Sequence, residues 1–210
     1  LDPLMAIATL VEPEYQKKMN KRIQSRLRSA HLRGCPQELT NCVDSAEREY
    51  LPRGITETLS TLDFIDSGLN VCILGPSDSG KSYLAKALGI VACNNYKVEY
   101  HHCETLLETL VALKAQDYSK YQKRLKKICG AALLILDDFL LHTITDEREV
   151  KVLFEILEKR CEINLSTIIC SQREPASWSS MILNDEVSAN AILKRATKHY
   201  TVVIKPNITD

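Results

Sequence analysis

The segment GPSDSGKS, residues 75–82, constrains the fold of this chain more than any other stretch. It matches the pattern G-x-x-x-x-G-K-[ST], in which glycines let the backbone wrap a chain of phosphates. Such a loop joins a buried strand to the first turn of a helix, whose N-H groups and dipole face the phosphates. We therefore predict a nucleoside triphosphate site. Its expected contacts are Gly75, Pro76, Ser77, Asp78, Ser79, Gly80, Lys81, Ser82 and Tyr83.

Two side chains of this loop have separate predicted roles. Lys81 is expected to reach the β and γ phosphates, and Ser82 is expected to hold Mg²⁺ through its hydroxyl. The apolar run NVCILG precedes the loop and the helical pattern KSYLAKALGIVAC follows it, which is the context that the motif requires.

Short apolar runs alternate with helical patterns along the rest of the chain, which is typical of a parallel sheet with crossover helices. We predict an α/β fold of the P-loop NTPase type, with a five-stranded parallel sheet flanked by helices. The 210 residues suit one large domain, over 53–210, with a small helical appendage over 1–52. The expected strands are 70–75, 96–101, 131–137, 165–171 and 200–205. The pattern of 145–162 predicts a helix with one apolar stripe.

Two consecutive carboxylates end the apolar run ALLILDD, residues 132–138. In an ATPase with this layout, Asp137 binds the metal and Asp138 orients the attacking water. Asp138 is one methylene shorter than the more common Glu, so its catalytic role is the weaker prediction. The alternative is a charged strand end that simply faces solvent.

A third polar strand end, STIICSQ, places Ser171 and Gln172 after the run 165–170. We predict that Ser171 senses the γ phosphate or the attacking water, although exposure to solvent alone also explains a polar strand end. The chain shows neither the base-specific acceptor pocket nor the arginine-rich lid of a monophosphate kinase. A molecular switch or motor of the AAA+ type explains the three strand ends better.

A basic amphipathic helix is predicted near the N-terminus. Lys17 to Arg33 contains seven Lys or Arg and no acidic residue, with Met19, Ile23 and Leu27 on one stripe. The whole chain carries 27 basic and 27 acidic side chains, so only this local excess points to nucleic acid. The alternative is a solvated helix whose charge is balanced by the acidic segment 44–50.

Composition limits the location of the protein. The eight cysteines form no C-x-x-C pair and have no histidine at zinc-ligand spacing, so we expect reduced thiols in a cytoplasmic protein without a zinc site. No apolar run approaches the length of a membrane span. The chain begins at Leu1 rather than Met, and we expect it to be part of a longer protein.

Three segments together resemble the IstB family of transposition helpers, AAA+ ATPases related to the DnaC helicase loaders. These segments are LSTLDFIDSGLNVCILGPSDSGKSYLAKALG, LLILDDF and the run from STIICSQREPASW to the last strand. The resemblance implies ATP and Mg²⁺ as ligands, ATP hydrolysis, assembly on duplex DNA and recruitment of the transposase of the same insertion element to its target. It also implies a homo-oligomer in which Arg195, on a helix over 187–198, completes the ATP site of the neighbouring subunit.

The chain departs from the family pattern at several places. Asp78 adds a negative charge to the phosphate loop, Lys194 stands where the family usually has an acid, and Leu140 replaces a frequent glycine. The family pattern also includes further N-terminal helices and a Ser-x-Arg ending, which lie outside these 210 residues, and we expect weaker subunit assembly without them. Two alternatives to the transposition helper remain: a DnaC-like helicase loader, and an ATP-bound scaffold that hydrolyses too slowly to matter. The single Trp178 is expected to serve packing.

Overall fold

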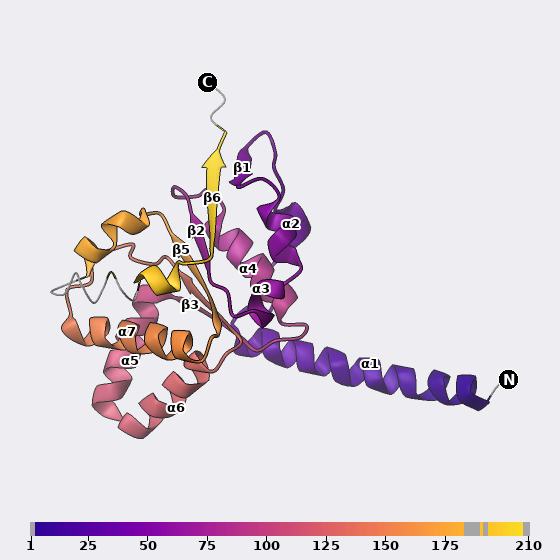
Figure 1. Cartoon of the computed structure of the whole chain (residues 1–210). Helices are drawn as coiled ribbons and strands as arrows, with labels where there is room; N and C mark the ends of the chain where they lie inside the picture. The colour runs from indigo at the N-terminus through magenta and orange to yellow at the C-terminus, as the bar shows by residue number, and fades with distance from the viewer. Residues whose placement is uncertain (1–2, 183–189, 191–192, 208–210) are drawn as a thin grey trace.

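A six-stranded sheet runs through the centre of the protein and carries helices on both faces (Figure 1). The computed structural model describes residues 3–182, 190 and 193–207. The strands lie in the order β1-β6-β2-β5-β4-β3, and all neighbours are parallel except β1, which runs antiparallel to β6. Their bounds are β1 Arg48–Leu51, β2 Val71–Leu74, β3 Val98–His102, β4 Leu133–Asp137, β5 Ser166–Ser171 and β6 Tyr200–Pro206.

All five predicted strands are present, and the predicted α/β class is confirmed. The count of five strands is wrong by one, because β1 adds an antiparallel edge strand. Its sequence REYL is short and half polar, so it carries no strand pattern of its own. Its backbone is held by pairing with β6, in the register Tyr50 to Ile204. The division of the chain at residue 52 stays a prediction.

Each face of the sheet buries its own apolar cluster, because side chains alternate along the strands. Within β2, Val71 and Ile73 face one cluster, whereas Cys72 and Leu74 face the other. The first cluster lies under the end of α1 (Pro3–Ser29), α2 (Ile55–Ser60), α3 (Asp63–Asp66) and α4 (Lys81–Ala92). The second lies under α5 (Cys103–Gln116), α6 (Tyr118–Cys129) and α7 (Glu147–Glu162). Short 3₁₀ turns occupy Leu39–Asn41, Pro175–Ser177 and Ser179–Met181.

Two sequence predictions about packing are confirmed. The predicted helix over 145–162 is α7, whose first turn is capped where the carboxylate of Asp146 accepts a hydrogen bond of 2.8 Å from the N-H of Arg148. Trp178 is fully buried, with its ring centroid 4.9 Å from that of Phe139. Its indole N-H donates to the carbonyl of Arg173 at 3.0 Å, so the buried polar atom is satisfied.

Helix α1 extends away from the body of the protein, and only its C-terminal end packs against it (Figure 1). Within the described residues, none of its basic side chains has a carboxylate within 4.0 Å. In segment 44–50, Glu47 pairs with Arg48 and Glu49 pairs with Arg53. The acidic segment therefore does not neutralise the helix by direct contact. None of the helices formed by the described residues is both long and apolar enough to cross a membrane.

A buried arginine joins α7 to the sheet and to the end of α6. Arg160 is 1% exposed, and its guanidinium donates to the carbonyls of Ile128 at 3.2 Å, Cys129 at 2.9 Å and Ala131 at 2.7 Å. It also donates to the Ser166 carbonyl and to the Thr167 hydroxyl. Burial lowers the pKa of Arg160 to about 10, so the side chain remains charged at neutral pH. It supplies hydrogen-bond donors to buried carbonyls at the end of α6, just after it and at the start of β5.

We expect Arg160→Met to lower the free energy of unfolding by about 3 kcal/mol or more, because several buried carbonyls lose their donor. Urea unfolding followed by circular dichroism measures this change. Arg160→Lys retains a charged donor and should lose clearly less. Equal stability of Arg160→Met and the unaltered protein would contradict the role given to this side chain.

Candidate nucleotide-binding site

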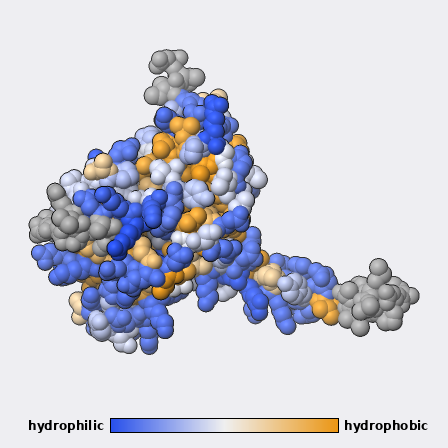
Figure 2. Space-filling view, viewed as in Figure 1, coloured by the Kyte–Doolittle hydropathy of each residue, from blue (hydrophilic) through white to orange (hydrophobic). Residues whose placement is uncertain are grey.

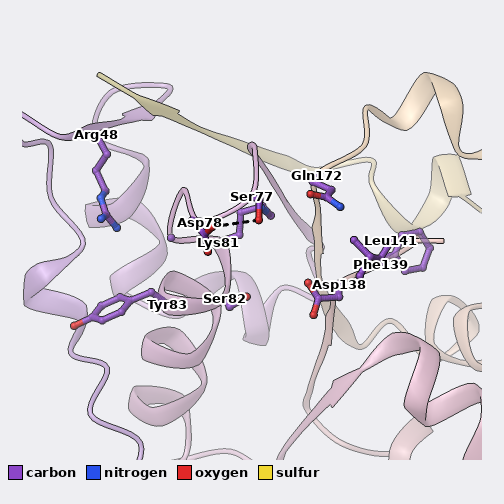
Figure 3. Close-up of a pocket in the computed structure, with 11 residues that line it drawn as sticks. Arg48, Ser77, Asp78, Lys81, Ser82, Tyr83, Asp138, Phe139, Leu141 and Gln172 are labelled. Carbon is purple, nitrogen blue, oxygen red and sulfur yellow. Dashed lines mark hydrogen bonds between the residues drawn. The ribbon is translucent and has the colours of Figure 1, made fainter. Parts of the chain in front are cut away.

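The carboxyl ends of β2, β4 and β5 meet at one edge of the sheet and border a pocket of about 460 Å³ (Figure 3). Ligands of open parallel sheets bind at this edge. The phosphate loop, the acidic end of β4 and the residue after β5 all contribute to the pocket. Its lining consists of Arg48, Ser77, Asp78, Gly80, Lys81, Ser82, Tyr83, Asp138, Phe139, Leu141 and Gln172.

The phosphate loop depends on glycine at two positions. Gly80 precedes α4 with φ +102°, and a Cβ there would collide with the guanidinium of Arg48. A Cβ at Gly75 would lie 2.6 Å from Oγ of Ser79 and 2.7 Å from the carbonyl of Ile204. Neighbouring atoms therefore leave little room for a side chain at either glycine of the loop. The Ser79 hydroxyl is buried there without a hydrogen-bond partner in the described structure.

Asp78 lines the pocket, with a left-handed backbone at φ +58°. The sequence predicted only that Asp78 adds a negative charge to the loop, not the direction of its carboxylate. Figure 3 shows it beside Ser77, whose Oγ lies 3.5 Å from Oδ2 of Asp78. Its negative charge consequently acts on the same space as the positive charge of Lys81.

The ammonium group of Lys81 is folded back onto its own loop. It donates to the carbonyl of Pro76 at 2.5 Å, and the residue is 8% exposed. Burial lowers the pKa of Lys81, and the nearby negative charges of Asp137 and Asp138 oppose that shift. A triphosphate would supply the counter-charge that this partly desolvated ammonium lacks.

The carboxylate of Asp137 is fully buried and its two oxygens have different partners. Oδ1 accepts from the Ser82 hydroxyl at 3.0 Å and from the N-H of Asp138 at 3.0 Å. Oδ2 accepts from the hydroxyl of Tyr100, on the neighbouring strand β3. Burial, and next the hydrogen bond to Asp137, raise the pKa of Tyr100, so the phenol stays protonated and donates. The sequence did not identify Tyr100, because pairing between β3 and β4 places it there.

The backbone turns sharply after Asp137. Asp138 and Leu140 have left-handed conformations, at φ +52° and +51°. This gives a physical reason for the glycine that the family often carries at the position of Leu140, since left-handed backbone disfavours a side chain. The turn brings Asp138 to the pocket, with its carboxylate about half exposed. Its Oδ2 lies 3.0 Å from Nδ1 of His102, at the end of β3.

Ser171 and Gln172 lie in different environments. The hydroxyl of Ser171 is buried and donates to the carbonyl of Phe139 at 2.8 Å, while the N-H of Arg173 donates to it at 3.1 Å. Gln172 lines the pocket. The sensor role of Ser171 stays a prediction, and Gln172 has the more direct access to a bound phosphate.

Arg195 is exposed and does not belong to the pocket lining. Its carbonyl accepts from the side-chain amide of Asn70 at 3.3 Å. Asn70 precedes β2, whereas the phosphate loop follows β2, so Arg195 lies toward the opposite edge of the sheet. Of its predicted helix over 187–198, residues 187–189 and 191–192 lie outside the described residues.

Arg48, Phe139 and Leu141 line the pocket but were not predicted from the sequence, and Arg48 was missed because it comes from the unpredicted strand β1. Arg48 extends from β1 toward the phosphate loop, on the side of the pocket away from Asp138 (Figure 3). Tyr83 lies on the same side, and its hydroxyl accepts hydrogen bonds from the N-H of Glu38 at 3.2 Å and the amide of Asn41 at 3.1 Å. The N-terminal segment therefore forms one wall of the pocket.

The residues present fit a nucleoside triphosphate and a divalent cation. The loop offers backbone N-H groups, the Lys81 ammonium and the Arg48 guanidinium to phosphate oxygens. The Ser82 hydroxyl and the Asp137 carboxylate supply the oxygen ligands that Mg²⁺ prefers.

Comparison with known proteins points to one family. The family model for the IstB-like ATP binding protein matches residues 4–207. An insertion-sequence ATP-binding protein of Sinorhizobium fredii is 38% identical over 190 residues, which cover 90% of this chain and 74% of that protein. The ATP-binding protein of insertion sequence IS21 from Pseudomonas aeruginosa is 28% identical over 214 residues, covering 94% and 79%.

Solved structures support the fold. The DnaC helicase loader aligns with a TM-score of 0.61 at 20% identity, over 81% of this chain and 98% of that chain. The replication initiator DnaA, bound to AMPPCP and single-stranded DNA, aligns with a TM-score of 0.65 at 19% identity. That match covers 82% of this chain but only 50% of the DnaA chain. At these identities the likeness concerns the fold alone, which is the AAA+ form of the P-loop fold predicted from the sequence.

We expect Arg48→Gln to weaken ATP binding about tenfold, because a cation facing the phosphate loop is lost. Titration calorimetry with ATP and Mg²⁺ measures the dissociation constant. Arg53→Gln is the matched control, since Arg53 is 84% exposed and does not line the pocket. If both variants bind ATP as the unaltered protein does, Arg48 is not a nucleotide contact.

Proposed function

This chain belongs to the family of IstB-like ATP-binding proteins, and from that premise we propose that it is an ATP-hydrolysing, DNA-binding helper of an insertion-sequence transposase. The observation that carries the proposal is the pairing of the phosphate loop with a buried acid, through the hydrogen bond between Ser82 and Asp137. This pair holds a hydroxyl and a carboxylate at the position where Mg²⁺ and the phosphates of ATP are expected to meet.

ATP hydrolysis needs a group that orients water, and Asp138 is proposed for that role. Its carboxylate reaches the pocket from the turn after β4, and His102 contacts one of its oxygens. Mg²⁺, when bound, would neutralise charge on the phosphates. Lys81 would bind phosphate oxygens, Asp137 would hold the cation, and Gln172 or Ser171 would respond to the terminal phosphate.

Assembly into a homo-oligomer with shared ATP sites is the second part of the proposal. Arg195 is exposed and lies toward the edge of the sheet opposite to its own phosphate loop, so a neighbouring subunit could receive it. An arginine supplied in this way stabilises the charge that develops on the transferred phosphoryl group. Lys194 beside it, also exposed, adds a second positive charge at the proposed contact.

The proposed DNA ligand is duplex DNA, bound through its phosphates. Within the described structure, the basic side chains of helix α1 have no carboxylate partner, so their charge is available to DNA phosphates. Because the Sinorhizobium and Pseudomonas relatives are named as insertion-sequence proteins, we propose the transposase of the same element as the protein partner. We further propose a cytoplasmic location and a functional division between an N-terminal segment, 1–52, and the ATPase domain, 53–210.

Two other functions make different predictions. A helicase loader of the DnaC kind shares this fold, but it should favour single strands and a helicase partner. A slow scaffold is suggested by Asp78, which places negative charge in the pocket, and by Asp138, which is shorter than Glu. Such a scaffold should not depend on the carboxylate of Asp138.

The proposed function predicts that ATP, but not ADP, enables tight binding to duplex DNA at physiological salt. Fluorescence anisotropy with labelled duplex and single-stranded DNA of equal length measures this for the unaltered protein and for Asp138→Asn. The variant should hydrolyse ATP at least about 100-fold more slowly and remain on DNA, because it binds ATP without completing the cycle.

Preference for single strands would contradict the proposal and favour a loader. Equal affinity for duplex DNA with ATP, with ADP and without nucleotide would contradict the proposal that ATP enables DNA binding. If Asp138→Asn releases DNA and hydrolyses ATP like the unaltered protein, the assignment of Asp138 is wrong.

A further inference from the structure

A basic groove of about 540 Å³ lies between the C-terminal part of α1 and the end of α6. One wall contains Ser25, Arg26 and Ser29 of α1, and the other contains Lys126 and Lys127 of α6. Lys97, just before β3, adds a further cation. The groove shares no lining residue with the nucleotide pocket, so it is a separate site.

The positive charge of this groove is only partly neutralised. Among the described lining residues the one acid is Glu99, which is 2% exposed and forms salt bridges with Lys127 at 2.9 Å and Arg124 at 3.4 Å. Burial opposes ionisation of Glu99, but hydrogen bonds from His101 and Lys127 outweigh it and lower its pKa. Within the described residues, Lys97 and Lys126 have no acidic partner within 4.0 Å.

Arg26 is held in place by the body of the protein. Its guanidinium donates to the carbonyl of Asn94 at 2.6 Å and to that of Cys93 at 3.3 Å, at the end of α4. These bonds satisfy two donors without neutralising the charge, because carbonyls carry none. They also fix α1 relative to the body, so the wall of the groove has a defined position.

The same face of α1 continues the groove outward along the projecting helix. Ser29, Ser25, Arg22 and Lys18 are spaced by four, three and four residues, which places them in one line on a helix surface. The small residues Ser29 and Ser25 lie in the part of this line that faces α6. The exposed cations Arg22 and Lys18 lie where the helix projects from the body of the protein. Figure 2 shows that the projecting part of α1 is mostly hydrophilic. The line from Ser29 to Lys18 spans about 16 Å at 1.5 Å per residue, enough to face several phosphates.

We infer that this groove, extended by Arg22 and Lys18, binds one phosphate backbone of duplex DNA; the inference rests on the proposed function and identifies where its DNA lies. Its chemistry favours a duplex over a single strand. Sites for single strands use aromatic side chains on which bases stack, and none of the described residues that line this groove is aromatic. Cations without aromatic partners recognise backbone charge and carry little sequence preference.

The test uses the full chain with a non-hydrolysable ATP analogue and labelled duplex DNA, over salt concentrations from about 0.05 to 0.25 M. The groove variant combines Arg22→Gln, Lys97→Gln and Lys126→Gln. The matched control combines Arg53→Gln, Lys151→Gln and Lys205→Gln, three exposed cations elsewhere on the surface. Nucleotide affinity of both variants serves as the check on folding.

Each phosphate contact contributes about 0.9 to the slope of log affinity against log salt. The groove variant should therefore lose about 2 to 3 from the slope, and about 100-fold in affinity near 0.1 M salt, whereas the control should change much less. Equal slopes for the two variants, with tight binding by the unaltered protein, would overturn the groove but leave the proposed function standing. No duplex binding by the unaltered protein would overturn both. Loss of single-stranded binding alone would show that the groove takes a different nucleic acid.

Discussion

The hydrogen bonds to the buried carboxylate of Asp137 hold the parts of the nucleotide site together. A fully buried charge is costly unless its oxygens are hydrogen-bonded, and here Ser82, the N-H of Asp138 and Tyr100 supply the donors. These donors belong to α4, to the turn after β4 and to β3. These hydrogen bonds to one carboxylate thus fix the phosphate loop, the turn that carries Asp138 and the neighbouring strand β3 relative to one another.

Strand β3 links the nucleotide site to the basic groove on the surface. Mg²⁺ at Ser82 and Asp137 would compete for the oxygen atoms that now bond each other, while Asp138 stays linked to His102 at the end of β3. The same strand β3 begins next to the basic groove, where Glu99 engages Lys127. A single short strand therefore has the nucleotide site at one end and the proposed DNA site at the other. On the side of the pocket near Arg48, the N-terminal segment also contacts the nucleotide site, where the N-H of Glu38 donates to the Tyr83 hydroxyl.

The sequence predicted the parts of the fold that have strong local patterns. The five apolar strands, α7 and the placement of the phosphate loop before α4 follow from periodicity and motif. The edge strand β1 was missed because four half-polar residues become a strand only through pairing with β6. Arg48 was missed for the same reason, and Tyr100 because only strand register brings it to Asp137. The burial of Arg160 was not predicted, because the carbonyls of Ile128, Cys129 and Ala131 that hold it in the interior belong to a different part of the chain. The positions of β1, Arg48, Tyr100 and Arg160 all depend on contacts between segments that are distant in sequence. Local sequence patterns do not contain that information.

We expect Asp137 and Ser82 together to form a cation site for a bound triphosphate. Calorimetric titration of ATP into the unaltered protein and Asp137→Asn, each with Mg²⁺ and with EDTA, measures whether they do. Mg²⁺ should strengthen ATP binding by the unaltered protein at least about tenfold, as a bridging cation should, and should have little effect on the variant. An equal gain from Mg²⁺ in both proteins would show that the cation is held without the carboxylate of Asp137.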